Sequence, residues 1–311
     1  VINKNYGDVK SNQNFTVAYA DPEETKRIRQ DFCRIYEENY PVIFSRRDHM
    51  DFSMVLSGVK KWRNDVGKSG IVRLPMGVRL SVKRDIISLP FRNDSGRNIA
   101  ILGSAENLQK NGVIPGQNNI AIGMIQSICL ALALQHPEGN ARFVLIDGLS
   151  KDVVRNSNMH RWTQLMERFG FPVEFVAATG AVNWLLDFRQ ELNDFGCDED
   201  TYICCLGMDR YSDFSEMNLS GESGADVFQQ LIKCGTKGVH FICWWSNVST
   251  YRSHLGFGND GYFGIKVLLR MDTDTARDIL GPFVTWSVRE NRAYVHDQTE
   301  LASNETVIPL M

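Results

Sequence analysis

Short apolar runs that alternate with helix-like stretches are the sequence feature that most limits what this chain can fold into. They follow one another from Arg97 to Leu280. Runs that are apolar on both faces and are separated by helical crossovers predict a parallel sheet covered by helices on both sides. We therefore expect an α/β fold with a mostly parallel sheet. The expected strands are residues 98–102, 142–146, 173–177, 202–206, 239–243 and 265–271, and the expected helices are residues 120–135, 160–169, 182–195, 225–234 and 273–280.

The first 96 residues have a different pattern. Asp21, Pro22 and Glu24 have the order of a helix N-terminus, with an N-cap, a proline at the first helical position and a carboxylate at the third. We expect that helix to end near Tyr40, before a proline. Runs at residues 70–80 and 85–91 predict antiparallel strands. The sequence thus predicts two domains, a helix and β-strand preamble at residues 1–96 and an α/β domain at residues 97–311.

Composition excludes several classes of protein. The 34 Lys and Arg against 37 Asp and Glu, a net charge of -3, leave no global positive charge to attract nucleic acid. Seven cysteines without CxxC spacing indicate a reducing compartment. The longest uncharged stretch, residues 111–137, is interrupted by Gln126 and Ser127, so it predicts a buried helix rather than a membrane span. We expect a cytoplasmic piece of a longer protein, with any membrane tether in a region outside this sequence.

Several motif matches fail on their context. Residues 256–261 fit G-x-G-x-x-G, but a dinucleotide fingerprint needs a strand before it and a helix after it, whereas here a strand follows. Residues 221–225 lack the last glycine of a nucleophile elbow and predict a loop before a helix. The six histidines have no metal-ligand spacing, and His240 lies inside an apolar run. These segments therefore predict loops and a core histidine.

A strand, a glycine-bearing loop and a buried helix occur together at residues 98–135, which is the layout of a phosphate-binding loop. The residue types of that loop do not match. Against G-x-x-x-x-G-K-[ST], Gly112 fits the first glycine, and Gly116 is followed by Gln117 at the second glycine. Asn118 stands at the lysine and Asn119 at the hydroxyl that binds Mg²⁺. Both the lysine charge and the hydroxyl are therefore missing.

The chain resembles the FtsK/SpoIIIE motor family in four blocks that come in the right order. Residues 98–148 resemble the strand, loop and helix that begin the family's nucleotide-binding domain, and residues 201–214 are similar to its strand ending in D-E-F-A-D-L. Residues 238–247 are similar to G-I-H-L-V-L-A-T-Q-R-P, and residues 266–281 resemble the block that follows. Residues 73–77 are similar to the lead-in strand of the family. The resemblance covers about residues 97–281 and implies a RecA-like P-loop NTPase fold.

The resemblance also implies ligands and roles. In the family, a Walker B aspartate holds Mg²⁺ through water and the following glutamate activates the attacking water. Asp209 stands at the aspartate and is the implied metal residue, whereas Arg210 replaces the glutamate and Ser246 replaces the glutamine that senses the γ-phosphate. ATP with Mg²⁺ is the implied ligand. The implied nucleotide-binding positions are Gly112, Gly116, Gln117, Asn118, Asn119, Asp147, Asp209, Arg210 and Ser246.

The motif residues of the family are missing at four separated places. Phosphoryl transfer depends on electrostatic positioning by such residues, so their loss suggests a site that no longer hydrolyses nucleotide. Our first hypothesis is a degenerate module, structural or regulatory, of a ring-forming translocase similar to type VII secretion ATPases. The expected partners are other modules or subunits, including a second copy of the chain, and DNA through the full assembly. An active ATP-dependent DNA translocase that uses the long loop at residues 104–117, and a partner-protein docking module, remain alternatives. Whether the chain is an enzyme stays open.

Other conspicuous side chains predict structural roles. Trp244 and Trp245 alternate across a strand, so we expect one of them in the core and the other exposed or at an interface. Arg270 and Arg277 are expected to form solvated ion pairs unless a neighbouring subunit covers them. The basic cluster at residues 60–63 predicts a solvated face.

Overall fold

The computed structural model describes residues 21–35, 50–80, 85–105, 119–149, 151, 158–211, 213–217, 221–300 and 304–310. The chain divides into two compact units, Val1–Phe44 and Ser45–Met311. The first contains helix α1 (Pro22–Ile35). The carboxylate of Asp21 accepts hydrogen bonds from the backbone N–H groups of Glu23 and Glu24, so the expected N-cap is confirmed. The expected helix end near Tyr40 lies outside the described residues.

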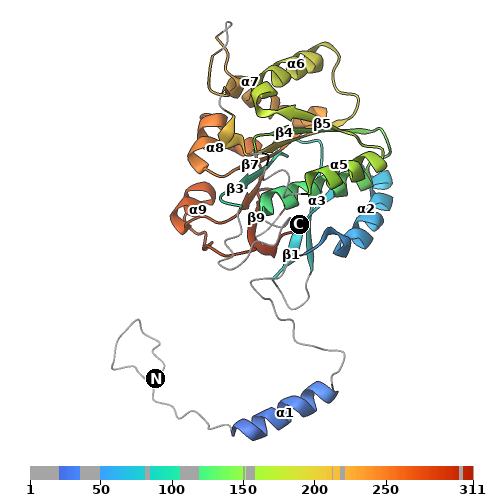
Figure 1. Ribbon diagram of the computed structural model, residues 1–311, viewed down its shortest axis with the longest axis vertical. Helices are drawn as coiled ribbons and strands as arrows, with labels where there is room; N and C mark the ends of the chain where they lie inside the picture. The colour runs from blue at the N-terminus through green and yellow to red at the C-terminus, as the bar shows by residue number, and fades with distance from the viewer. Residues whose placement is uncertain are drawn as a thin grey trace. The chain divides into compact units, whose positions relative to one another are not determined.

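The second unit is built on one sheet, in which the described strands have the order β2-β1-β10-β9-β8-β3-β7-β6-β4-β5 (Figure 1). The strands from β8 to β5 pair in parallel, and those from β2 to β8 pair antiparallel. Their bounds are β1 Val72–Arg79, β2 Ile86–Phe91, β3 Ile99–Leu102, β4 Ala141–Asp147, β5 Val173–Ala177, β6 Asp200–Leu206, β7 Val239–Trp245, β8 Ile265–Leu268, β9 Ala293–Asp297 and β10 Glu305–Ile308.

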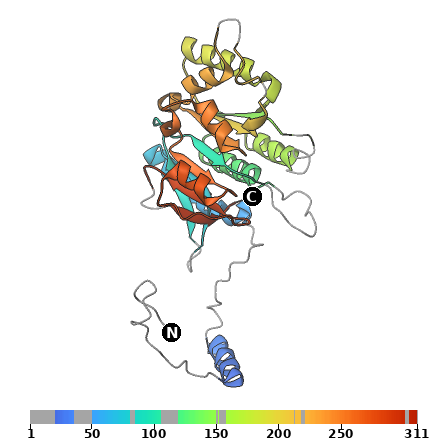
Figure 2. The same ribbon diagram turned by 90° about the vertical axis from the view of Figure 1, so that its left-hand side faces the viewer.

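Helices cover both faces of this sheet, as Figures 1 and 2 show. Helices α3 and α5 pack on one face, with α2 beside α3 and β1, whereas α6, α7, α8 and α9 pack on the other. The expected sheet covered on both faces is therefore confirmed. The bounds of the helices are α2 Leu56–Ser69, α3 Ile120–Gln135, α5 Met159–Arg168, α6 Ala181–Asp194, α7 Gly224–Leu231, α8 Val248–Leu255 and α9 Thr273–Leu280.

Helix α3 lies under the sheet as the uncharged stretch predicted. Most of its residues are buried, including the polar Ser127 and Gln135. The amide of Gln135 satisfies its burial by donating to the backbone carbonyls of Arg73 and Ala131 and accepting from the N–H of Arg73. An apolar helix that is buried on nearly every side is typical of the interior of a large domain. Helix α3 contacts both β1 and the parallel strand β6.

The structure adds elements that the sequence analysis did not predict. Helix α2 lies in the segment before β1, helix α8 follows β7, and β9 and β10 extend the sheet at its antiparallel end. Through β10, the strands β1 and β2 join the same sheet as the parallel strands. The compact unit begins at Ser45, and the domain boundary expected at residue 96 stays a prediction.

The expectation for the two tryptophans of β7 was wrong. Trp244 is 6% exposed and Trp245 is fully buried. Strand β7 lies between β3 and β6 inside the sheet, where helices cover both faces, so both alternate side chains reach a core. The indole N–H of Trp244 donates to the Gly103 carbonyl, and that of Trp245 donates to Nδ1 of His254.

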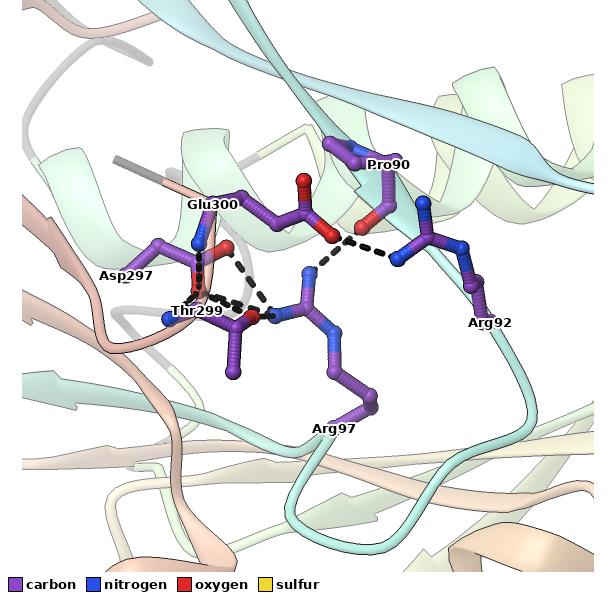
Figure 3. Close-up of polar contacts among 6 residues, drawn as sticks. All are labelled: Pro90, Arg92, Arg97, Asp297, Thr299 and Glu300. Carbon is purple, nitrogen blue, oxygen red and sulfur yellow. Dashed lines mark hydrogen bonds and ion pairs between the residues drawn. The ribbon is translucent and has the colours of Figure 1, made fainter. Parts of the chain in front are cut away.

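A buried ion pair joins the parallel and antiparallel parts of the sheet (Figure 3). The guanidinium of Arg97, just before β3, lies 2.9 Å from the carboxylate of Asp297 at the end of β9, and neither side chain is more than 6% exposed. The same guanidinium also donates to the Thr299 hydroxyl and to the Pro90 carbonyl of β2. One side chain thereby binds both β2 and the end of β9, which lies 200 residues further along the chain than Arg97.

Candidate functional site at the carboxyl edge of the parallel strands

The site residues expected from the sequence that the structure describes lie at one edge of the sheet. Strands β3, β4, β6 and β7 are parallel, and Leu102 pairs with Trp245 as Asp147 pairs with Leu206, so their carboxyl ends coincide. Asn119 joins them because the Ile120 N–H donates to the carbonyl of Ala105, just beyond β3. Asp147, Asp209, Arg210 and Ser246 follow the other strands. Gly112, Gly116, Gln117 and Asn118 lie outside the described residues.

The carboxylate of Asp209 binds the segment that begins helix α8. Its Oδ2 accepts hydrogen bonds from the N–H and hydroxyl of Ser246, at 2.6 Å and 2.8 Å. Its Oδ1 accepts from the N–H of Asn247, at 3.1 Å. Asn247 is itself the N-cap of α8, with its side-chain oxygen 2.8 Å from the N–H of Ser249. A negative charge at a helix N-terminus is stabilising, so Asp209 completes the start of α8.

The turn that carries Asp209 follows β6 directly. Gly207 has φ of 61°, in the left-handed region that glycine tolerates, and turns the chain into a short 3-10 helix at Met208–Arg210. The Arg210 side chain is exposed on this turn. The residue after Asp209 is thus a cation in solvent, and the hydrolytic carboxylate expected there in the motor family is replaced by the opposite charge.

Asp147 is half-buried beside the same turn. Desolvation raises the pKa of its carboxyl group, while a hydrogen bond from the Leu149 N–H and the positive charge of Arg210 lower it. The next residue, Gly148, packs against β6 so closely that a Cβ atom there would lie 2.6 Å from the Gly207 carbonyl oxygen. The ends of β4 and β6 are therefore held together by backbone contact.

The end of β3, where a phosphate-binding loop would begin, is held by its neighbours. The Gly103 N–H donates to the Trp245 carbonyl, and the Ser104 N–H donates to the Arg270 carbonyl. The Arg270 guanidinium donates to the Ser104 hydroxyl, at 3.0 Å. Arg270 thus makes a contact inside the sheet edge that the sequence analysis missed. Arg277 forms the expected solvated ion pair with Asp274.

His254 is a further residue that sequence reasoning missed. It lies on α8, is 4% exposed, and accepts the indole hydrogen bond of Trp245 through Nδ1, at 3.2 Å. Burial lowers its pKa to about 4, although the negative charge of Asp209 acts in the opposite direction. No spacing in the sequence marks this histidine, because helix α8 itself was not predicted.

Asn119 is the N-cap of α3. Its side-chain oxygen accepts a hydrogen bond from the Ile122 N–H, at 3.0 Å. An amide can cap a helix, but it lacks the hydroxyl by which a P-loop residue binds Mg²⁺. The residue at the Mg²⁺-binding position of the loop is thus engaged with its own helix.

The described donor set does not fit a hydrolytic Mg²⁺ site. Three hydrogen bonds occupy most of the lone pairs of the Asp209 carboxylate, and the adjacent side chain is the cationic Arg210. Among the described residues, no group of three or more His, Cys, Asp and Glu side chains is placed to hold a metal ion. Through Asp209, the described side chains of this edge bind the N-terminus of a helix.

No helix within the described ranges is long and apolar enough to cross a membrane. This agrees with the interpretation of residues 111–137 as containing a buried helix. In the structure, that helix is α3, whose sixteen residues lie between the sheet and α2 and α5.

Comparison with solved structures identifies proteins with a similar fold. The cytoplasmic domain of EssC matches 94% of this chain over 54% of its own length, with a TM-score of 0.51 and 11% identity. The cytoplasmic domain of the Thermomonospora curvata type VII secretion ATPase EccC matches 77% of this chain, with a TM-score of 0.49 and 13% identity. The pCW3 conjugation coupling protein TcpA matches 78% of this chain, with a TM-score of 0.45 and 10% identity.

This chain spans 54% of the matched EssC chain and 28% of the matched EccC chain. No family model matches the sequence, and no curated protein matches it. The likeness to EssC therefore concerns the fold. The expected RecA-like P-loop NTPase fold is confirmed.

Proposed function

We propose that this chain is a non-hydrolysing module of an FtsK/SpoIIIE-type translocase, with a structural or regulatory role in a larger cytoplasmic assembly. The fold shared with EssC supports the family, as do the four sequence blocks in their order. The length of the matched EssC chain supports a place within a longer protein, with other modules as partners. DNA would be contacted through the full assembly, because this chain has a net charge of -3.

The observation that carries the proposal is the position of the Asp209 carboxylate. In the motor family this group serves the metal ion, whereas here both oxygens accept hydrogen bonds from Ser246 and Asn247. Ser246 stands where the family has its phosphate-sensing glutamine, so the two positions bind each other. The site has become an internal contact between β6 and α8.

Arg210 supports the same conclusion from charge. Hydrolysis of a nucleoside triphosphate needs a group that orients the attacking water, and the family uses a carboxylate for this purpose. A guanidinium cannot be deprotonated in a protein and cannot act as a base. An arginine at this position is compatible with binding an anion but not with activating water.

Nucleotide binding and hydrolysis test the proposal directly. A ligand present at 100 times its dissociation constant stabilises a fold by about 2.7 kcal/mol, which raises the melting temperature by several degrees. We expect ATP, ADP or a non-hydrolysable analogue with Mg²⁺ to give no shift, and ATP to release no phosphate above a blank. A clear shift that is lost in Asp209→Ala, or phosphate release above the blank, would contradict the proposal.

A restored loop provides the positive control. The triple variant Gln117→Gly, Asn118→Lys, Asn119→Thr brings back the second glycine, the lysine and the hydroxyl of the motif. We expect it to gain a nucleotide-dependent thermal shift without hydrolysis, because Arg210 still replaces the glutamate. The single variant Asn119→Thr serves as the matched control and should show no shift.

A further inference from the structure

The strand at one end of the sheet has an open side. β5 is the last strand in the sheet order, and within the described ranges it pairs only with β4. Alternate residues of a strand direct their backbone N–H and C=O groups to opposite neighbours, so part of the β5 backbone faces away from the sheet. Such an edge is a template for pairing with another strand, and native proteins usually protect it.

The two edges of this sheet differ in protection. The other edge strand, β2, contains Pro90, which cannot donate a backbone hydrogen bond, and its carbonyl accepts from Arg97. β5 has no proline or lysine between its first and last residues. Its one charged residue, Glu174, is held by Arg142 at 2.9 Å and by the indole N–H of Trp184 at 2.6 Å. Between Val173 and Ala177, β5 therefore has neither the proline nor the lysine that commonly protects an edge strand.

Three partly exposed apolar side chains lie on β5 and at the end of α5, two elements that contact each other. Phe175 in the middle of β5 is 53% exposed, and Leu165 and Phe169, near the end of α5, are 37% exposed each. Val173 packs into the core on the α5 side of the sheet, and Phe175, two residues on, points to that same side. We call Leu165, Phe169 and Phe175 the β5 edge patch. Phe175 thus places an exposed aromatic ring on the edge strand itself.

We propose that two copies of this chain associate through β5, in an antiparallel pair of β5 strands that joins their sheets. A two-fold axis through Phe175 places Phe175 opposite its own copy, Glu174 opposite Val176, and Val173 opposite Ala177. No like charges oppose each other in this register, and the central aromatic pair is favourable. The strand is therefore complementary to itself, which favours a second copy as the occupant over an unrelated strand.

The proposal concerns an interface and is independent of the nucleotide site. β5 lies beyond β4 in the sheet order, whereas the Asp209 contact lies between β6 and α8. Loss of one would leave the other unchanged, so nucleotide experiments and association experiments report on separate conclusions.

Sedimentation equilibrium of the chain and two matched variants tests the interface. We expect a reversible dimer, conversion to monomer in Phe175→Arg, and an unchanged dimer in Phe257→Arg. Phe257 lies in the turn after α8 and is fully exposed, so its replacement controls for the loss of exposed apolar surface. Circular dichroism checks that both variants keep the fold. A monomer at every concentration, or a dimer that persists in Phe175→Arg, would overturn the proposal.

A cysteine at the axis gives a second measurement. In Phe175→Cys, the two introduced thiols would face each other across the axis and form an intermolecular disulfide under mild oxidation by a small disulfide. We expect a reducible covalent dimer with Phe175→Cys and little with Phe257→Cys. Equal cross-linking by the two variants would show collision between exposed thiols and would contradict the register.

Discussion

Single side chains at the strand ends of this protein bind one another. The Asp209 carboxylate accepts three hydrogen bonds from the start of α8, and the Arg270 guanidinium binds the Ser104 hydroxyl. Each contact joins the segments that follow two neighbouring strands of the sheet. These two side chains are consequently bonded within the chain.

Replacing Asp209 tests that role by stability. We expect Asp209→Ala to lower the free energy of unfolding by about 1–2 kcal/mol, because it removes charge-assisted hydrogen bonds at a helix start. Urea unfolding followed by circular dichroism measures it. Asp198→Ala, at an exposed position before β6, should change stability by less than about 0.5 kcal/mol. Equal effects of the two changes would show that Asp209 does not hold α8.

Breaking the buried pair of Arg97 and Asp297 should lower the free energy of unfolding more than replacing Asp209 does. Asp297→Ala leaves a buried guanidinium without its counter-charge, which costs about 3–5 kcal/mol. The exposed pair of Arg277 and Asp274 is the matched control, and Asp274→Ala should cost less than about 1 kcal/mol. Urea midpoints compare the two variants. A similar small loss in both would show that the Arg97 pair is not essential to the sheet.

Buried histidines make stability fall in mild acid. Burial lowers the pKa of His240 and of His254 to about 4, against about 6.5 for the unfolded chain. The unfolded state therefore binds more protons between these values, and the stability present above pH 6.5 is lost as the pH falls towards 4. We expect urea midpoints to drop from pH 7 to pH 5, and to drop less in His254→Gln. Urea midpoints that stay constant from pH 7 to pH 5 would contradict the expected loss of stability from the buried histidines.

Among the elements, α3 and α8 begin with asparagine N-caps at the same edge of the sheet. Asn119 caps α3, and Asn247 caps α8 two residues after β7. The two helices pack on opposite faces of the sheet, and both have their N-termini at the carboxyl edge of the parallel strands. Helix N-termini attract anions, and both of these helices begin at the edge where the sequence analysis expected the nucleotide positions.

The cap of α3 has a measurable contribution. We expect Asn119→Ala to lower the free energy of unfolding by about 1 kcal/mol, since the Ile122 N–H loses its partner. Asn119→Thr restores a capping oxygen and should lose less. Urea unfolding of both variants distinguishes the cap from a general packing effect. An equal loss in alanine and threonine variants would show that the hydrogen bond contributes nothing.

The whole molecule has no net positive charge. With 34 basic and 37 acidic residues, it lacks the excess that brings a protein to DNA through counterion release. We expect this chain by itself to bind duplex DNA weakly, with a shallow dependence of affinity on salt. Fluorescence anisotropy over a range of salt concentrations measures the slope. A steep fall of affinity with salt would indicate several phosphate contacts and would favour an active DNA translocase.

The sequence by itself determined the order and nature of the central elements. The bounds expected for β5, α3 and α9 agree with the structure because hydrophobic periodicity and capping residues are local signals. Helix α8 was not predicted, because its eight residues have weak apolar periodicity and begin where a strand has just ended. Strands β9 and β10 are short and lie after the family blocks.

Only the tertiary structure decided which polar groups meet. Asp209 lies 37 residues from Ser246, and Arg97 lies 200 residues from Asp297, so no local pattern relates either pair. Sequence comparison placed Asp209 at a metal-binding position, but a carboxylate binds whatever donors the packing brings to it. Those donors are Ser246 and Asn247, which lead into a helix that the sequence did not reveal. A hydrogen bond forms only when the donor and acceptor lie about 2.7–3.2 Å apart, and only the packed sheet sets that distance.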